Sequence, residues 1–248
     1  MQASIDLAAA YDPVQMVLGA GIDPDPWQAK LLRSQSQRVL VNCSRQSGKS
    51  TTTAILADHT AFYESGSTIL LLSPSLRQSS ELFRKCMDVY RALDRPVPSE
   101  AETALKLELE NESRIVSLPG KEGTVRGISK VKLLIIDEAS RVPDELYKAV
   151  RPMLAVSGGR LVLLSTPFGT RGFFWEAWKN REKWDYYEVP ATECPRISPE
   201  FLEEEKESMG DWFFQQEYLC KFMDAQDAAF RSEDIARIVQ KDIETWQF

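Results

Sequence analysis

Short apolar runs alternate with helix-type segments along most of the chain. Runs typical of buried β-strands occur at residues 38–42, 68–72, 131–136, 161–164 and 186–189. Helical patterns occur at 51–63, which is followed by a Ser-Gly turn, and at 79–93. Buried strands that alternate with helices are typical of an α/β fold, with a mostly parallel central sheet covered by helices on both faces.

A different pattern separates the second strand from the third. Leucines alternate with Lys and Glu over 105–110, and an alternating segment follows at 114–118, after the turn-type residues 111–113. Alternation with a period of two indicates strands with one exposed face. The sequence therefore predicts a half-exposed β-hairpin inserted between the core strands.

Composition and charge limit the classes of function. The 248 residues are 43% hydrophobic and 27% charged, which excludes collagen-like, coiled-coil and wholly disordered chains. The net charge of -7 argues against nucleic-acid binding through an overall basic field, although a local basic face remains open, with Arg77, Arg84 and Lys85 as candidates. Since His59 is the one histidine, a metal site built from several histidines is excluded.

The cysteines and the N-terminal segment bear on the compartment. The four cysteines form no CxxC pair, which favours a reducing cytoplasm. Residues 1–21 contain Asp6 and Asp12 but no Lys or Arg, which does not fit a secretory signal. No apolar run reaches the roughly 20 residues that a membrane span needs. We therefore expect a cytoplasmic protein that does not contact a membrane.

A candidate phosphate-binding loop follows the first predicted strand. The consensus G-x-x-x-x-G-K-[ST] fits at 43–50, except that Cys43 replaces the first glycine. Backbone amides at a helix N-terminus can bind phosphate, Lys49 can bridge the β- and γ-phosphates, and the Ser50 hydroxyl can bind Mg²⁺. The alternative is a chance turn that caps a helix, but the strand before it and the helix after it favour the loop. The predicted ATP-binding residues here are Ser44, Arg45, Gln46, Ser47, Gly48, Lys49, Ser50 and Thr51.

The most apolar strand ends in two carboxylates. Leu133–Ile136 leads directly into Asp137 and Glu138, the arrangement of a Walker B motif. Asp137 is predicted to hold Mg²⁺ together with Ser50, and Glu138 to polarise the attacking water. An ordinary solvated strand end is the alternative. The two motifs in the correct order are more specific than either motif alone.

With these motifs the chain resembles the ATPase domain of phage large terminases, the motors that package DNA into procapsids. The resemblance extends from Asp25 to about Phe222, and the segment Ser44–Ser50 is similar to the family's phosphate loop, which tolerates loss of the first glycine. The resemblance implies a P-loop NTPase fold and hydrolysis of ATP with Mg²⁺. It also implies double-stranded DNA, a portal protein and a small terminase subunit as partners, a homo-oligomeric ring that is a pentamer in the family, and the host cytoplasm as location.

The resemblance also suggests roles for individual residues. Trp27 and Gln28 lie in a segment similar to the family's adenine-recognising Q segment, although Trp27 fits core packing at least as well. Ser165 and Thr166, after the fourth strand, are similar to the coupling motif, and their alternative is an ordinary strand end.

Two arginines are candidates for stabilising the charge of the transition state. The resemblance places the family's trans-acting arginine at Arg126, whose alternative is a surface arginine near a turn. Arg45, inside the loop, is a candidate for the same role in cis, or for sensing nucleotide or bracing the loop.

The predicted organisation is an ATPase domain at 1–222, whose first part, 1–37, is helical and binds adenine. Residues 223–248 are expected to be a linker toward a nuclease domain that this chain lacks, so no nuclease activity is expected, and the aromatic residues of a helix at 211–218 are expected in the core. Two alternatives remain open. One is another P-loop nucleic-acid translocase or helicase-like ATPase, although the chain is too short for two motor lobes. The other is a non-hydrolysing ATP-binding regulator, against which Glu138 argues.

Overall fold

A computed structural model describes residues 2–120, 128 and 130–224 of the chain. In this part, one sheet holds eight strands in the order β3-β4-β5-β2-β6-β7-β1-β8. The strands are β1 (Arg38–Cys43), β2 (Thr68–Ser73), β3 (Ser99–Glu102), β4 (Lys106–Leu109), β5 (Arg114–Pro119), β6 (Val131–Asp137), β7 (Arg160–Ser165) and β8 (Asp185–Val189). From β5 to β8 all neighbours are parallel, and β4 is antiparallel to both of its neighbours, β3 and β5.

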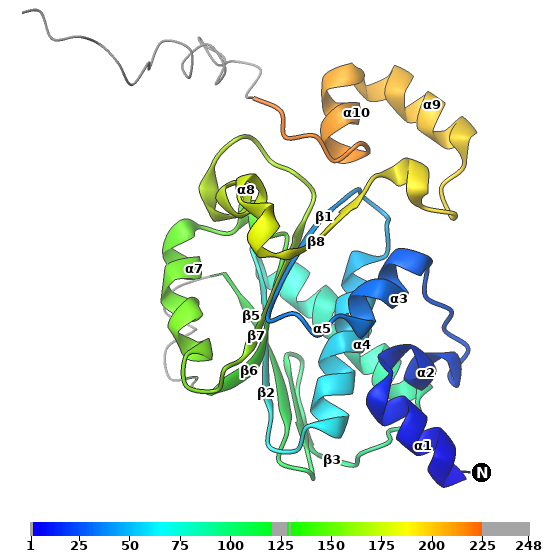
Figure 1. Cartoon of the computed structure of the whole chain (residues 1–248), viewed down its shortest axis with the longest axis vertical. Helices are drawn as coiled ribbons and strands as arrows, with labels where there is room; N and C mark the ends of the chain where they lie inside the picture. Colours follow the sequence, from blue (N-terminus) through cyan, green and yellow to red (C-terminus); the bar gives the residue numbers. More distant parts are fainter. Residues whose placement is uncertain (1, 121–127, 129, 225–248) are drawn as a thin grey trace, which may run out of the picture.

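Helices cover both faces of the sheet (Figure 1). On one face lie α1 (Gln2–Tyr11), α2 (Pro13–Leu18), α3 (Pro26–Arg33), α4 (Lys49–Tyr63) and α5 (Leu76–Ala92); on the other lie α7 (Asp144–Val150) and α8 (Gly172–Lys179). Each layer packs its own hydrophobic core against the sheet. The α/β architecture predicted from the apolar runs is confirmed, with each predicted strand within two residues of its observed ends.

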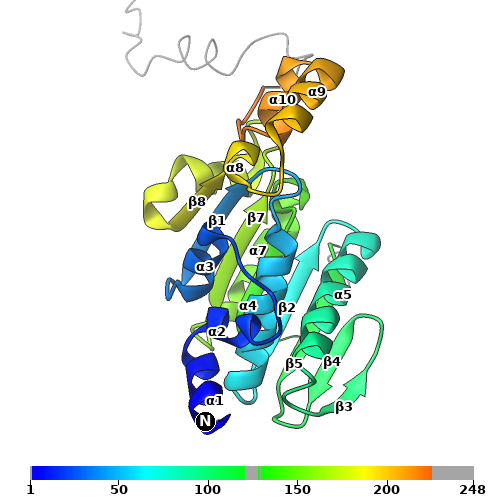
Figure 2. The ribbon, with the colours of Figure 1, turned by 90° about the vertical axis from the view of Figure 1, so that its right-hand side faces the viewer.

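A further pair of helices lies at one end of the molecule. Figure 2 shows α9 (Pro199–Met209) and α10 (Asp211–Glu217) beyond the sheet, where the chain continues after β8. Phe214 and Tyr218 are buried in their small core, as predicted, but Phe213 is 46% exposed, so the prediction of a buried aromatic was wrong there. The reason is the helical period: residues four apart share a face, whereas their neighbours point elsewhere.

The predicted hairpin is formed by β4 and β5, but it is part of the main sheet. Its strand β5 pairs in parallel with β2 along its whole length, and α5 packs against it. The sequence did not reveal β3, whose residues Ser99–Glu102 are polar and mostly exposed. An exposed edge strand needs no apolar face, and short charged strands are typical of sheet edges.

Three further predictions concern a membrane span, the linker and the domain boundaries. No helix among the described residues is long and apolar enough to cross a membrane. The predicted linker at 223–248 lies, from residue 225 onward, outside the described residues, and the domain boundaries stay predictions.

One acidic side chain is buried inside α4. The carboxyl group of Asp58 is fully buried and makes no hydrogen bond within the described part of the chain. Burial disfavours the charged form, so it raises the pKa of Asp58 well above its ordinary value. Because the pKa is higher in the folded state, Asp58 does not lower the free energy of unfolding at pH values below its unfolded-state pKa. As the pH rises from there toward the folded-state pKa, the free energy of unfolding decreases.

We therefore predict that Asp58→Asn stabilises the protein in a pH-dependent way. Asparagine keeps the shape of the side chain but cannot ionise, so the melting-temperature gain over the natural chain should be small at pH 5 and larger at pH 8. Each unit of pKa shift corresponds to about 1.4 kcal/mol. Thermal melting at both pH values tests this, with Asp88→Asn on the exposed side of α5 as control. An equal gain at both pH values would contradict the prediction.

Candidate functional site

The connection between β1 and α4 has the geometry of a phosphate-binding loop. Gly48 adopts φ +89°, in the left-handed region that favours glycine. A Cβ atom there would lie 2.6 Å from Gln28 Nε2 and 3.0 Å from Arg196 Nη2, so the ends of both side chains would have to move. The backbone conformation therefore favours the glycine of the motif, and its absent side chain leaves room for the contacts of Gln28 and Arg196.

Some polar groups of the loop form hydrogen bonds within the protein, whereas a run of its backbone N–H groups does not. Ser44 donates its backbone N–H to the Val189 carbonyl oxygen, and the Ser47 hydroxyl donates to the Ser44 carbonyl oxygen, each at 2.9 Å. Both serines are completely buried, and these two hydrogen bonds hold the loop in place. In the described part of the chain, the backbone N–H groups of 46–50 donate no hydrogen bond to the protein. These amides are available to an anion at the start of α4.

A polar cavity of about 730 Å³ opens beside this loop. It is lined by Arg45, Gln46, Gly48, Lys49, Ser50, Thr51, Gln78, Lys85, Glu138, Arg141, Thr166 and Arg196. Of the predicted loop residues, only Ser44 and Ser47 do not line it. Lys85, a candidate for a basic nucleic-acid face, lies here and donates to Thr51 Oγ1 at 3.4 Å, whereas Arg84 pairs with Glu81 on the helix surface.

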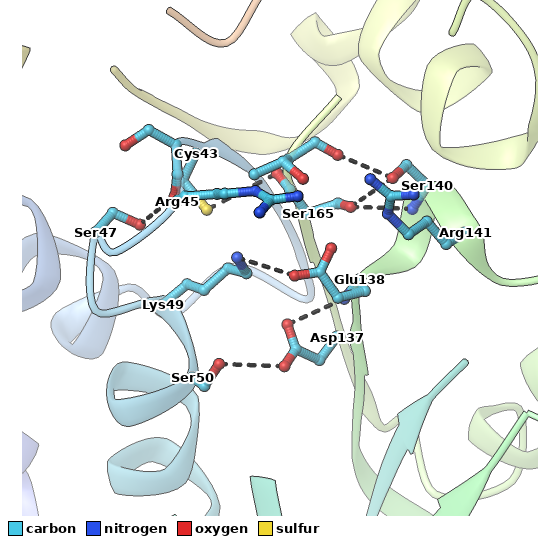
Figure 3. A network of polar contacts seen from close by, with 12 residues as sticks. Cys43, Arg45, Ser47, Lys49, Ser50, Asp137, Glu138, Ser140, Arg141 and Ser165 are labelled. Carbon is cyan, nitrogen blue, oxygen red and sulfur yellow. Dashed lines mark hydrogen bonds and ion pairs between the residues drawn. The ribbon is translucent and has the colours of Figure 1, made fainter. Parts of the chain in front are cut away.

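The two predicted motifs meet in this cavity. Lys49 Nζ lies 3.0 Å from Glu138 Oε1, and Ser50 Oγ donates to Asp137 Oδ2 at 3.2 Å (Figure 3). Glu138 adopts φ +51°, and its N–H donates to Asp137 Oδ1 at 3.0 Å. This turn points the two neighbouring carboxylates at different partners, so they can have different roles.

Burial and the neighbouring charges together raise the pKa values of both Asp137 and Lys49. Burial raises the pKa of Asp137 to about 6; the Lys49 ammonium opposes that rise and the Glu138 carboxylate adds to it. For Lys49, burial opposes the charged form, but the neighbouring carboxylates outweigh it and the pKa is raised. Lys49 therefore stays an ammonium ion at neutral pH, facing two acidic groups.

The donor set fits Mg²⁺. The Ser50 hydroxyl and the Asp137 carboxylate place two hard oxygen atoms side by side at the edge of the cavity. Among the described residues there is no group of three or more His, Cys, Asp or Glu that could hold a metal. Mg²⁺ bound with a nucleotide typically uses one or two protein ligands, with phosphate oxygens and water completing the shell.

The predicted coupling residues connect β7 to the segment after Glu138. Ser165 Oγ lies 2.7 Å from Ser140 Oγ and accepts the Ser140 backbone N–H at 3.2 Å, and Ser140 Oγ donates to the Thr166 carbonyl oxygen at 2.8 Å. Thr166 lines the cavity, whereas Ser165 is completely buried. Cys43 Sγ lies 3.8 Å from the Ser165 carbonyl oxygen, and burial raises the pKa of its thiol to about 12, so it stays protonated.

The predicted adenine-binding residues, Trp27 and Gln28, lie on α3, and Gln28 contacts the phosphate loop. Gln28 Oε1 accepts the Asp25 backbone N–H at 2.7 Å, which caps α3, and its Nε2 lies 3.4 Å from the Gly48 carbonyl oxygen. Trp27 packs against the core, and its indole N–H has no partner among the described residues. Neither lines the cavity, so both roles in adenine binding stay predictions.

Sequence reasoning missed three residues of the site. Arg196 pairs with Asp25 at 2.7 Å and donates to the Ser47 carbonyl oxygen at 3.1 Å. Arg141 and Glu217 form an ionic group with Arg45. No local pattern identifies these residues, because each lies in an irregular segment or at a helix end. The predicted trans-acting residue Arg126 lies outside the described residues.

The comparisons with known proteins agree with the fold. The chain matches the family model for the terminase large subunit, T4-like-virus type, N-terminal, over residues 40–237. It is 25% identical over 243 residues to the terminase large subunit of Thermus phage G20c. That match covers 88% of this chain and 49% of the relative, so the chain spans about half the length of this curated relative.

Two solved structures share the architecture. The ATPase domain of the Thermus phage P74-26 large terminase superposes with a TM-score of 0.74 at 22% identity, over 84% of this chain and 97% of that domain. The large terminase of bacteriophage D6E in complex with ADP has a TM-score of 0.62 at 11% identity, over 85% of this chain and 53% of that protein. The fold is thus that of terminase ATPase domains, a P-loop NTPase fold, and the chain belongs to the terminase large subunit family.

Proposed function

We propose that this chain binds ATP with Mg²⁺ and hydrolyses it, as the motor domain that drives double-stranded DNA into a procapsid. The observation that carries the proposal is the meeting of Lys49, Ser50 and Glu138 in one polar cavity, with Asp137 hydrogen-bonded to Ser50, beside loop amides that have no partner among the described residues. The related D6E protein was solved with ADP, which supports a nucleotide as the ligand of this cavity.

Each residue of the cavity has a distinct role in the proposed reaction. The amides of residues 46–50 and the Lys49 ammonium bind the phosphates, while Ser50 and Asp137 hold Mg²⁺. Bound there, Mg²⁺ would supply positive charge to the phosphate oxygens. Glu138 orients a water molecule and takes its proton as the oxygen attacks the γ-phosphorus and the bond to ADP breaks. Its present partner, Lys49, must turn toward the phosphates for this to happen.

The wider assignments rest on membership of the family. They are a homo-oligomeric ring, a pentamer by resemblance, with Arg126 acting on a neighbour's site, and contacts with a portal protein and a small terminase subunit in the host cytoplasm. Ser165 and Thr166 would couple the nucleotide state to the segment after β7. A non-hydrolysing regulator is disfavoured because Glu138 lies at the phosphate end of the cavity, 3.0 Å from Lys49.

Lys49→Ala should reduce ATP hydrolysis by about 10²-fold or more, because it removes the buried positive charge that contacts the phosphates. Phosphate release measures the loss, and circular dichroism with thermal melting verifies folding. Lys132→Ala, which removes an ammonium group of β6 that pairs with Glu64, is the matched control and should retain full activity. Normal turnover by a folded Lys49→Ala variant would reject the phosphate-loop assignment.

The two carboxylates should give different defects. Glu138→Gln should bind ATP with Mg²⁺ yet hydrolyse it about 10²-fold or more slowly, because the amide cannot take the proton from water. Asp137→Asn should instead raise the Mg²⁺ concentration needed for binding and turnover. Nucleotide-binding titrations at several Mg²⁺ concentrations, with phosphate-release assays, separate the two. If the phenotypes were interchanged, the roles of the two carboxylates would be reversed.

A further inference from the structure

Glu217, the last residue of α10, is bound to the phosphate loop although it lies far from it in sequence. Its Oε2 accepts a hydrogen bond from Arg45 Nε at 2.6 Å, and its backbone carbonyl oxygen accepts the Arg45 backbone N–H at 3.1 Å. The Glu217 side chain is only 9% exposed, whereas that of Arg45 is 60% exposed. A nearly buried carboxylate therefore holds a side chain that reaches into solvent.

The geometry of this bond leaves the reactive end of Arg45 available. A guanidinium group has five N–H donors in a fixed plane, and Glu217 uses the single one on Nε. Among the described residues, the terminal Nη1 and Nη2 groups of Arg45 donate no hydrogen bond. Arg45 lines the cavity, and in Figure 3 its side chain runs from the loop toward Glu138 and Arg141. The four terminal N–H groups are thus directed toward the place proposed for phosphate.

A second arginine lies beside the Glu217 carboxylate. Arg141 Nη2 lies 3.6 Å from Glu217 Oε1, on the other side of the carboxylate from Arg45. The Arg141 guanidinium is itself fixed by stacking over the Phe168 ring, 4.1 Å from its centre. Arg45, Arg141 and Glu217 together carry one net positive charge on this side of the cavity, which suits the anionic phosphates of a nucleotide.

We infer that Glu217 is a positioning residue for ATP hydrolysis, which orients Arg45 so that its terminal N–H groups meet the γ-phosphate. Glu217 itself does not touch nucleotide. Fixing a flexible arginine in advance lowers the cost of ordering it in the transition state, and a misplacement of about 1 Å can reduce a rate about 10²-fold. This inference rests on the proposed function of the cavity.

The test is a double-mutant cycle between Glu217 and Arg45. Glu217→Ala should lower kcat roughly 10- to 10²-fold while KM changes less, because the lost contact matters most in the transition state. In an Arg45→Ala background the same substitution should have almost no further effect on kcat. Glu217→Gln, whose amide oxygen can still accept a hydrogen bond from Arg45 Nε, should retain more of the rate than Glu217→Ala. If the alanine variant does not fold, the glutamine variant replaces it in the double-mutant cycle.

The matched control is Glu205→Ala. Glu205 lies on α9, and its carboxylate accepts a hydrogen bond from Tyr218 Oη, the neighbour of Glu217 in sequence, at 2.8 Å; among the described residues it makes no hydrogen bond or ion pair with Arg45. This variant should lower the melting temperature without changing kcat, which separates the stability of the helical pair from the positioning of Arg45.

The outcomes separate the inference from the proposed function. Full activity in folded Glu217→Ala, or effects of Glu217→Ala and Arg45→Ala that multiply, would overturn the inference, while loss of activity in Lys49→Ala would still support the function. A natural chain that neither binds nor hydrolyses ATP would overturn both.

Discussion

The site depends on the parallel register of β6, β7 and β1. Asp137 of β6 pairs with Leu164 of β7, which pairs in turn with Val41 of β1. Because parallel strands end at the same edge of a sheet, the residues that follow these three positions must meet there. They are Glu138, the coupling pair after Leu164, and the phosphate loop. A shift of one residue in either pairing would move a carboxylate to the opposite face.

Within this frame, the charges immediately around Lys49 have a negative excess that favours a cation, although arginines line the rest of the cavity. Lys49 faces both Asp137 and Glu138, so one ammonium ion stands against two carboxylates in a largely buried place. Burial raises the pKa of Asp137 to about 6, which reflects the cost of keeping the second negative charge there. A divalent ion beside Ser50 and Asp137 would remove that cost, and a polyphosphate would bring the counter-charge that Lys49 and the arginines need.

The sequence predicted what is local and left out what depends on the fold. Apolar runs identified the core strands, and the phosphate loop and Asp137-Glu138 could be found because each lies within a few residues of a strand end. The adenine-binding role predicted for Gln28 stays a prediction, but its capping of α3 and its contact with the loop were not foreseen. Glu217 could not be predicted, because its partner Arg45 is 172 positions away and one glutamate in a helix carries no signal. Likewise β3 is visible only through its pairing with β4.

Hydrogen bonds to residues far away in sequence restrict the movement of the phosphate loop. Ser44 donates to the Val189 carbonyl oxygen, Asn42 Nδ2 to the Cys220 carbonyl oxygen at 2.8 Å, and Arg45 to the Glu217 carbonyl oxygen. These bonds join the end of β1 and the loop to β8 and to the end of α10, and Ala191 closes the group by donating to the Tyr218 carbonyl oxygen at 2.8 Å. Buried main-chain groups that lose their partners are costly, at about 1–3 kcal/mol each. A nucleotide that displaced the loop would therefore move α10 with it, or would have to break several of these bonds together. The phosphate loop and the helical pair at the end of the molecule are therefore joined by direct hydrogen bonds.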